Sequence, residues 1–324
     1  MKAARYDRYG PAREVLRVED VERPEPGPGE VRVRVEFSGV NPTDWKSRSG
    51  ATPRPIDGFQ IPHHDGAGVI DAVGAGVDPG RAGQRVWLWM AAAGRRWGTA
   101  AEWAVVPVYA AVPLPDGVSA ELGASLGVPA LTAHRCLFAD GPIDGQTVLV
   151  AGGAGAVGHF AIELAVRAGA QVIATVSGPE KAELAAKAGA AHVVNYTGAD
   201  AAGQIRAAVG QTDRIIEVAL GANLHLDLAV ARPGSTVVTY AAEPTDPVLP
   251  VRACMTANVV LRFILLYGVP RDALDRAAAD ISAALADGAL TELPVAARIP
   301  LSDVVAAHEA AEAGPLGKVL VIPS

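Results

Sequence analysis

The segment from Val148 to Val176 restricts the fold more than any other part of this 324-residue chain. It begins with a continuous apolar run, VLVAG, which is typical of a strand buried on both faces of a sheet. Glycines follow at once, and Gly153, Gly155 and Gly158 form the pattern G-x-G-x-x-G. Apolar residues at helical spacing and a second apolar run come next. The segment therefore predicts a strand, turn, helix and strand, which is a βαβ unit.

The glycine turn in this setting predicts binding of a dinucleotide. The first glycine allows a tight turn, the second lets the backbone approach a pyrophosphate, and the third lets the helix pack on the strand. Amides at the start of the helix then face the phosphates. The candidate cofactor-binding residues of the turn are Gly153, Ala154, Gly155, Ala156, Val157 and Gly158. The alternative is a glycine-rich turn without a ligand, in a chain that contains 35 glycines.

The end of the second strand favours NADPH over NADH. An NAD site carries Asp or Glu about twenty residues after the motif, bonded to the ribose 2′-hydroxyl. Here the strand ends in Ala174, Thr175, Val176 and Ser177, without an acid. Ser177 can donate to a 2′-phosphate, and Lys181 can supply a positive charge. The alternative is that Ser177 caps the next helix and that Lys181 is a solvated surface lysine.

The composition excludes several classes of protein. The net charge of −7 and the lack of a basic run argue against a nucleic-acid partner. No apolar stretch reaches membrane-spanning length, and the N-terminal segment lacks the apolar core of a signal peptide, so we expect no membrane partner and a cytoplasmic location. Two cysteines, Cys136 and Cys254, are too few for a four-thiolate zinc site. We expect both to be small, buried apolar side chains that do not form a disulfide.

Two patterns along the chain predict an α/β protein of two domains. Short strands separated by turns, without helices, run to about Ala120 and predict an irregular β-barrel or sandwich. Strands and helices then alternate, which predicts a doubly wound, six-stranded parallel sheet of the Rossmann type. We expect helices over 116–131 and from Pro270 to Leu285, and strands over 293–301 and 317–323 that return to the first domain. The expected domains are 1–121 with 290–324, and 122–289.

Six blocks in this order carry a family resemblance: GVNPTDWKSRSG (39–50), HHDGAGVIDAVGAGV (63–77), GTAAEWAVV (98–106), the glycine motif, residues 175–196, and GKVLVIP (317–323). The chain resembles the medium-chain dehydrogenase/reductase superfamily, and within it the zinc-free NADPH:quinone oxidoreductase, or zeta-crystallin-like, branch. The resemblance spans nearly the whole chain. It implies a GroES-like catalytic β-barrel for the first domain and an NADP-binding Rossmann domain for the second.

The same resemblance implies further cofactor contacts. It places Asn41 near the nicotinamide ribose, and Gly317 and Lys318 beside the cofactor. It also places Ser177, Lys181 and Tyr196 around the 2′-phosphate. Tyr196 ends the third expected strand, where its phenol can donate to a phosphate, although a half-exposed tyrosine at a strand end is the alternative.

The resemblance also allows a count of zinc ligands. Zinc alcohol dehydrogenases of the superfamily use a Cys, a His and a second Cys, and leave a fourth position for substrate. The first position here is Asn41, the second is His64, and the third falls in GVPAL (127–131), which has no thiol or imidazole. One histidine cannot hold zinc. We therefore expect no metal, and hydride transfer without metal polarisation of a carbonyl.

The candidate catalytic residues are Asn41, Asp44, Lys46 and His64. His64 could give a proton to the reduced acceptor, or it could be a packing residue bonded to Asp65. Asp44 and Lys46 are expected in a loop after Asn41, where Asp44 bonds backbone amides. Lys46 could stabilise a developing oxyanion, or it could be a surface lysine.

These features lead to three hypotheses of function. The first is NADPH-dependent hydride transfer to a small electrophilic acceptor, a quinone or an α,β-unsaturated carbonyl compound, since such acceptors need positioning in a dry site more than electrophilic help. The second is an enoyl- or acryloyl-CoA-type reductase, in which Arg95 and Arg96 would meet the nucleotide end. The third is a non-catalytic, crystallin-like NADPH-binding protein. The apolar sixth strand, NVVLRFILL (258–266), would be an open sheet edge, so we expect a homodimer through it, with Arg262 paired or at the interface.

Overall fold

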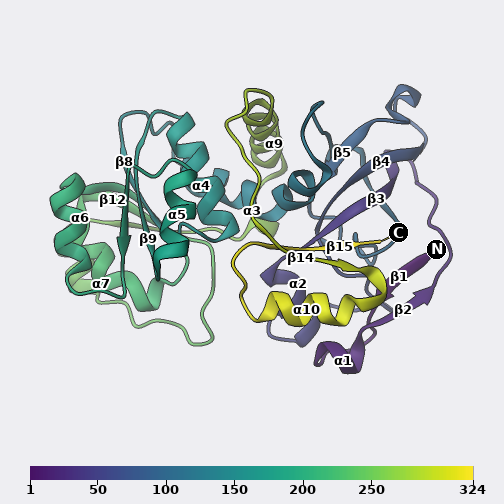
Figure 1. The fold of residues 1–324 in the computed structure, drawn as a ribbon, viewed down its shortest axis with the longest axis horizontal. Coiled ribbons are helices and arrows are strands. Elements are labelled where there is room, and N and C mark those ends of the chain that lie inside the picture. The colour runs from purple at the N-terminus through teal and green to yellow at the C-terminus, as the bar shows by residue number, and fades with distance from the viewer. Residues whose placement is uncertain (324) are drawn as a thin grey trace. The chain divides into compact units, whose positions relative to one another are not determined.

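The computed structural model describes residues 1–323, and the chain divides there into two compact units. Unit 1 comprises Met1–Val128 and the described residues from Glu292 onward, and unit 2 is Pro129–Thr291. Figure 1 shows both ends of the chain, purple and yellow, in unit 1. Helix α3 (Ala120–Phe138) carries the chain across the division, so the expected boundary after residue 121 falls inside a helix. The expected domain boundaries stay a prediction.

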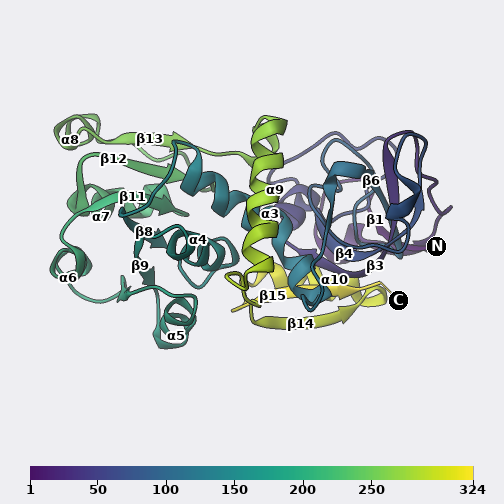
Figure 2. The same cartoon turned by 90° about the horizontal axis from the view of Figure 1, so that it is seen from above.

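Unit 2 is a layered α/β unit. Its strands are β8 (Thr147–Ala151), β9 (Gln171–Val176), β10 (His192–Asn195), β11 (Thr212–Glu217), β12 (Ala231–Thr239) and β13 (Val260–Phe263). Its helices are α4 (Ala156–Arg167), α5 (Pro179–Lys187), α6 (Ala201–Val209), α7 (Leu220–Val230), α8 (Val251–Ala257) and α9 (Arg271–Ala286), with a 3₁₀ turn η3 (Leu266–Gly268). The strands pair in parallel in the order β10-β9-β8-β11-β12-β13, much of which Figure 2 shows edge to edge.

This strand order places the first strand of the unit, β8, beside the point where the order reverses. It is the 3-2-1-4-5-6 order of the Rossmann fold, which confirms the predicted doubly wound sheet. Helices α4 and α5 pack against β8, β9 and β10, while α6 and α7 lie on the other side of the sheet (Figure 1). Because both faces are covered, Val148, Leu149 and Val150 are all buried, which explains the continuous apolar run in the sequence.

The sixth strand is shorter than the sequence suggests. We expected it to run through residues 258–266, but β13 has four residues. Among the described residues its one neighbouring strand is β12, which ends at Thr239, and the carbonyl of Thr239 accepts a last bond from the amide of Ile264. Beyond that residue no strand offers a partner, and the chain turns into η3. An edge strand is therefore limited by the length of its single neighbour.

Unit 1 is mainly β-structure. Its strands are β1 (Lys2–Arg5), β2 (Arg17–Asp20), β3 (Glu30–Val40), β4 (Asp65–Val73), β5 (Arg85–Leu88), β6 (Trp103–Pro107), β7 (Ala111–Pro113), β14 (Val295–Pro300) and β15 (Lys318–Ile322). Its remaining elements are α1 (Ala12–Val15), α2 (Pro42–Ser49), α10 (Val304–Glu312), η1 (Pro79–Arg81), η2 (Val108–Ala110) and η4 (Leu301–Asp303). The main sheet has the order β14-β15-β3-β4-β5-β7, with β6 also paired to β3, and β1 pairs with β2 separately. The last strand of the chain, β15, lies antiparallel to β3.

Helix α2 corrects the expectation that this region has no helices and that Asp44 and Lys46 lie in a loop. Asn41 is its N-cap residue, Pro42 occupies the first turn, and Gly50 ends the helix at φ 89°. The carboxylate of Asp44 accepts a hydrogen bond from the Asn41 amide at 2.7 Å. The expected bond from Asp44 to a backbone amide is thus present, but it stabilises the start of a helix.

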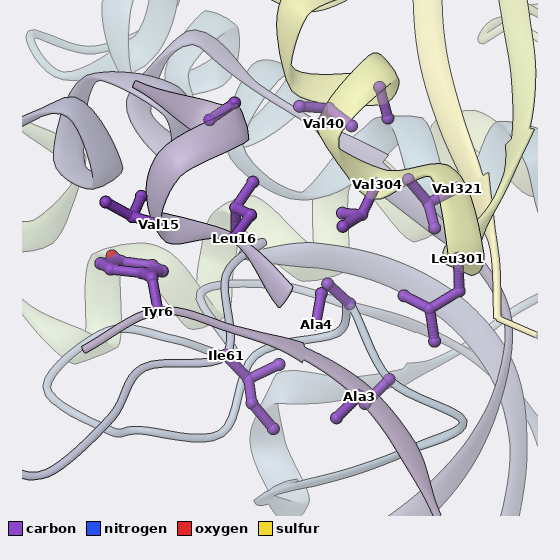
Figure 3. Packing of buried hydrophobic residues seen from close by; sticks show 14 of the residues in the cluster. Ala3, Ala4, Tyr6, Val15, Leu16, Val40, Ile61, Leu301, Val304 and Val321 are labelled. Carbon is purple, nitrogen blue, oxygen red and sulfur yellow. The ribbon is translucent and has the colours of Figure 1, made fainter. Parts of the chain in front are cut away.

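One hydrophobic core joins the two ends of the chain within unit 1. Figure 3 shows Ala3 and Ala4 of β1 packed in the same cluster as Val304 of α10 and Val321 of β15, with Val40 at the end of β3. The segments after Glu292 are thus part of the core of unit 1.

Two further expectations concern exposure. Cys136 is buried as expected, whereas Cys254 is only partly buried, because the short helix α8 that carries it has no buried residue. Both cysteines are free. Of the helices within residues 1–323, none combines the length and the apolar character that crossing a membrane requires.

Candidate functional site

The glycine turn lies between β8 and α4, where the sequence predicts it. A Cβ on Gly153 would lie 2.7 Å from the Cβ of Ala174, and one on Gly158 would lie 2.9 Å from the Cα of Gly153. Packing within the protein therefore requires these two glycines. A Cβ on Gly155, the N-cap of α4, would meet nothing closer than the Gly152 oxygen at 3.4 Å.

This difference bears on whether the turn suits a dinucleotide. The protein itself has room for a side chain at Gly155. Because glycine has no side chain, this room stays open for a ligand at the start of α4. The first amides of α4, from Ala156 to Gly158, have no partner within the helix. Space and unpaired donors at one helix start are the combination that a pyrophosphate needs. The turn fits the group that the sequence predicts.

The residues expected around a 2′-phosphate lie together at the carboxyl edge of the sheet. Lys181 Nζ donates a hydrogen bond to Ser177 Oγ at 2.9 Å. The amide of Tyr196 donates to the carbonyl of Val176, which fixes Tyr196 next to the end of β9, and its side chain is 46% exposed. Helix α5 has Gly178 as its N-cap residue, so Ser177 does not cap it. The hydroxyl of Ser177 and the ammonium group of Lys181 therefore lie together, and the backbone of the exposed Tyr196 lies next to the strand that ends just before them.

In unit 1, the structure brings Asn41, Asp65 and Lys318 into one buried cluster. The Asn41 amide Nδ2 donates to Asp65 Oδ2 at 2.7 Å, and Lys318 Nζ donates to Asn41 Oδ1 at 2.6 Å. Lys318 Nζ also lies 3.7 Å from Asp65 Oδ2. Burial lowers the pKa of Lys318 and raises that of Asp65, while the attraction between the two charges opposes both changes. Asn41 thus bridges a buried ion pair.

Glycines make room for this ion pair. A Cβ on Gly127 would lie 2.6 Å from Asp65 Cγ, and one on Gly39 would lie 2.9 Å from Lys318 Cε. The carboxylate of Asp65 also accepts a bond from the Val128 amide at 2.8 Å. Gly317, just before Lys318, has φ 109°, a conformation that a side chain disfavours. The resemblance implied roles for Asn41, Gly317 and Lys318, and the structure shows that two of these residues directly organise the cluster.

Asp44 and His64 have unusual environments. Burial, and to a smaller extent repulsion from Asp65, raises the pKa of Asp44 to about 7. The backbone amide of Asn41 and the charges of Lys318 and Arg54 act in the opposite direction and lower it. Burial, followed by the charge of Arg54 and the proximity of His63, lowers the pKa of His64 to about 3. Arg54 Nη1 lies 3.0 Å from His64 Nε2. Since the guanidinium can only donate, Nε2 accepts, and His64 is neutral at physiological pH.

His63 takes part in a directional chain of hydrogen bonds. Thr99 Oγ1 donates to the backbone carbonyl of Asp65 at 2.6 Å, so its oxygen accepts from Ser38 Oγ at 2.7 Å. Ser38 then accepts from His63 Nδ1 at 2.8 Å, which leaves His63 Nε2 to accept from His308 Nε2 at 3.0 Å. Burial lowers the pKa of His63 to about 3 and also lowers the pKa of His308, so both rings are neutral. Within residues 1–323, His308 Nδ1 has no partner.

The sequence analysis did not identify Ser47, Arg54 or His308 as members of this region. His308 carried a signal, because it follows the buried Val304 and Ala307 on the inward face of α10. Arg54 lies in a turn segment, TPRPIDG, without periodicity. The remaining candidate, Lys46, lies on α2 with its Nζ 5.7 Å from the centre of the Trp45 ring.

The three arginines that the sequence analysis singled out each form an ion pair with a carboxylate. Arg95 forms an ion pair with Glu30, and Arg96 forms one with Asp57 at 2.5 Å. Arg262 on β13 pairs with Asp140, as the sequence analysis anticipated when it expected this residue to be paired or at an interface.

The donors at the expected zinc positions do not suit zinc. Both polar atoms of the Asn41 side chain are engaged by Asp65 and Lys318, and His64 Nε2 faces a guanidinium. Position 127, at the start of the third ligand segment, is a glycine packed against Asp65. In the described part of the chain, no group of three or more His, Cys, Asp or Glu side chains could hold a metal ion.

Comparisons with known proteins agree with this architecture. The profile of the family described as "Alcohol dehydrogenase GroES-like domain" matches residues 27–116, and that of "Zinc-binding dehydrogenase" matches residues 156–283. The chain is similar to quinone oxidoreductase from Lama guanicoe, with 30% identity over 328 residues that cover 99% of this chain and 97% of the relative. Human quinone oxidoreductase is 29% identical over 313 residues, which cover 95% and 93% of the two chains.

Solved structures give the same assignment. A mycobacterial protein in complex with NADPH superposes with a TM-score of 0.87 at 32% identity, with complete coverage of both chains. Escherichia coli quinone oxidoreductase in complex with NADPH also has a TM-score of 0.87, at 25% identity and with complete coverage of both chains. The fold, the glycine turn and these similarities together show that the protein belongs to the medium-chain dehydrogenase/reductase superfamily of oxidoreductases, in its quinone oxidoreductase branch.

Proposed function

We propose that this protein is an NADPH-dependent oxidoreductase that passes a hydride to a quinone or an α,β-unsaturated carbonyl compound. The observation that carries the proposal is the grouping of Ser177, Lys181 and Tyr196 at the edge of a sheet whose glycine turn has room for a pyrophosphate. Similar proteins solved in complex with NADPH support the same coenzyme. NADPH supplies the hydride when it is bound.

The protein's own residues hold the coenzyme in this proposal. The turn from Gly153 to Gly158, including Ala154, Gly155, Ala156 and Val157, would bind the pyrophosphate through backbone amides. Ser177, Lys181 and Tyr196 would bind the 2′-phosphate. We further propose that Asn41, Gly317 and Lys318 serve the nicotinamide end, where the Lys318 ammonium contributes a positive charge held by Asn41 and Asp65.

The absence of suitable zinc ligands restricts the acceptor. A simple ketone needs strong polarisation before it accepts a hydride, whereas quinones and enones are already electron-poor. The positively charged Arg54, beside the neutral His64, is the cation of unit 1 best placed to favour negative charge on an acceptor oxygen. We do not extend the proposal to CoA thioesters, because Arg95 and Arg96 are already engaged by carboxylates.

Steady-state assays test the proposal. The purified protein is titrated with NADPH and with NADH, and turnover is then measured with a panel of quinones, enones and CoA thioesters. We expect tighter binding of NADPH and turnover of quinones or enones. Tight NADPH binding with no turnover of any acceptor would support the non-catalytic alternative, and a preference for NADH would contradict the role of Ser177 and Lys181.

We also propose a homodimer that pairs through the edge of the unit 2 sheet. Within residues 1–323, strand β13 pairs with β12 alone, and the apolar residues Phe263 and Leu265 are 67% and 69% exposed there. A second copy of the chain would cover this edge. A cytoplasmic location stays a prediction.

A further inference from the structure

Hydride transfer leaves the acceptor one proton short. A quinone that gains a hydride becomes a hydroquinone monoanion, and an enone becomes an enolate, so each needs one proton on an oxygen or carbon. The proposed function does not say which group supplies it. The following inference rests on that proposed function and concerns the source of the proton.

A small cavity in unit 1 contains the relevant groups. It encloses about 20 Å³, which is room for one water molecule. Its buried lining is formed mainly by Tyr6, Asp44, Ser47, His63 and His64, and its half-exposed rim includes Arg54, Ile56 and Gln60. The lining of the cavity thus combines polar groups with apolar ones such as Ile56 and Ala92, and Arg54 places a positive charge at its rim.

Asp44 and Ser47, which both line this cavity, each have a buried polar atom without a hydrogen-bond partner among the described residues. Asp44 is 3% exposed, and while its Oδ2 accepts the Asn41 amide, its Oδ1 has no hydrogen bond to any described residue. Ser47 lies three residues further along α2, on the same face of the helix, and its buried Oγ is also unpaired within residues 1–323. Buried polar atoms without a protein partner normally bind a water molecule where an adjoining space has room for one.

We propose that Asp44 donates the proton to the reduced acceptor through a single water molecule held by Asp44 and Ser47 in this cavity. The O–H bond of the Asp44 carboxyl group breaks as its proton passes to the water, and a proton of that water forms the new O–H bond on the acceptor anion. Asp44 is left as a carboxylate, which takes a proton from solvent before the next turnover. No further oxidant or reductant is needed, because both electrons arrive with the hydride.

The surroundings of Asp44 suit this step. The titratable and charged groups that face it are Tyr6, Arg54, His63, His64, Asp65 and Lys318. Burial and Asp65 raise the pKa of Asp44, the cations Arg54 and Lys318 lower it, and the result is about 7. A carboxyl group with such a pKa is present in both forms near neutral pH, as a proton donor requires. Arg54 at the rim attracts the anion that receives the proton.

Other groups nearby suit the step less well. His64 is neutral, and its Nε2 already accepts from Arg54. Both ring nitrogens of His63 are engaged by Ser38 and His308. Lys318 is held by Asn41 and Asp65 and does not line the cavity. Asp44 is therefore the acidic group that lines the cavity and has an oxygen without a partner among the described residues.

The test compares Asp44→Asn with Asp44→Ala in the full-length protein. An asparagine oxygen can still accept the Asn41 amide, so Asp44→Asn keeps the start of α2 while it removes the acidic proton. We expect kcat to fall by about 100-fold in both variants. In the wild type, kcat should fall as the pH rises above about 7, because the protonated form is consumed. In Asp44→Asn this pH dependence should disappear, and in Asp44→Ala, where the shorter side chain leaves room, added formate should restore part of kcat.

Serine variants provide matched controls on the same helix. Ser47→Ala removes one ligand of the water and should lower kcat by about tenfold, with a smaller solvent isotope effect than the wild type. Ser49→Ala lies outside the cavity, where its hydroxyl donates to the Lys46 carbonyl, and should behave like the wild type. Thermal unfolding and NADPH affinity of every variant show whether the fold and the coenzyme site are intact.

The outcomes separate this inference from the proposed function. A wild-type protein that reduces no acceptor contradicts the proposed function, and this inference with it. If the wild type turns over but Asp44→Asn keeps its kcat within threefold and its pH profile unchanged, then Asp44 only stabilises the helix, and the inference alone is wrong. A loss of kcat only in Asp44→Ala, together with a lower unfolding temperature, leads to the same conclusion.

Discussion

The two glycines at the start of α4 should respond in opposite ways to the same substitution. In Gly158→Ala the new Cβ would overlap the Gly152 carbonyl and lie 2.9 Å from the Gly153 Cα, and both are backbone atoms that cannot move aside cheaply. In Gly155→Ala the nearest atom is 3.4 Å away, which is an ordinary contact. The first variant therefore perturbs the protein, and the second perturbs only what binds to it.

The magnitudes follow from this geometry. Overpacking against fixed backbone costs about 3 kcal/mol, and the better helix propensity of alanine offsets about 1 kcal/mol. We therefore expect Gly158→Ala to lower the free energy of unfolding by about 2 kcal/mol, and the unfolding temperature by about 4–8 °C. In Gly155→Ala, a poorer N-cap costs about 1 kcal/mol, and the less flexible unfolded chain returns about 0.4–1 kcal/mol. Its stability should change by less than about 1 kcal/mol.

NADPH affinity, in contrast to stability, should fall clearly in Gly155→Ala. The methyl group of Gly155→Ala occupies the space that the pyrophosphate would use, so NADPH affinity should fall at least about tenfold, which is about 1.4 kcal/mol. Urea unfolding and fluorescence titration with NADPH measure the two effects on the same samples. If Gly155→Ala binds NADPH as tightly as the wild type, the pyrophosphate does not lie at this turn. If Gly158→Ala is as stable as the wild type, the packing argument is wrong.

Four further variants test other parts of the structure. Lys181→Ala should weaken NADPH binding about tenfold and leave NADH binding unchanged; equal losses for both coenzymes would remove the 2′-phosphate from this site. Lys318→Met should lower the free energy of unfolding by about 3–5 kcal/mol, because Asp65 stays buried without its cation, and a second change, Asp65→Asn, should recover part of that loss in urea unfolding. Below about pH 6.5, the free energy of unfolding of the wild type falls as the pH falls. In His308→Gln this fall should be smaller by about 1.4 kcal/mol per pH unit. The reason is that the folded protein keeps this ring neutral, with a lowered pKa, while the unfolded chain takes up the proton; an unchanged slope would mean that His308 titrates normally. Phe263→Asp should convert the dimer to a monomer in light scattering, and a wild-type monomer at micromolar concentration would contradict the dimer itself.

Local sequence signals were enough to predict unit 2. The glycine turn and the apolar run of β8 depend on residues close together in the chain, and the parallel sheet confirms what they indicated. Helix α2 was missed although Asn41, Pro42 and Gly50 are ordinary start and end signals. Its residues, PTDWKSRS, are nearly all polar, so hydrophobic periodicity could not reveal it.

The polar organisation of unit 1 could not be predicted in the same way. His63 and His308 are separated by 245 positions, and only the packing of α10 onto the sheet brings them within 3.0 Å. The neutral state of His64 and the raised pKa of Asp44 depend on burial, which a pattern of residue types does not show. The resemblance identified Asn41 and Lys318, but the hydrogen bond between them and the position of Asp65 beside both emerged from the fold.

The chain's route gives the two units different histories during synthesis. A ribosome completes unit 2 by Thr291, and its sheet can then form while the rest of the message is still being read. The first 128 residues must wait, since their sheet lacks β15 and the carboxylates of Asp44 and Asp65 lack Lys318 until that segment has been synthesised. A nascent chain that stops shortly before Lys318 would therefore carry a complete unit 2 sheet, together with a unit 1 whose sheet lacks β15 and whose Asp44 and Asp65 carboxylates lack their nearby lysine.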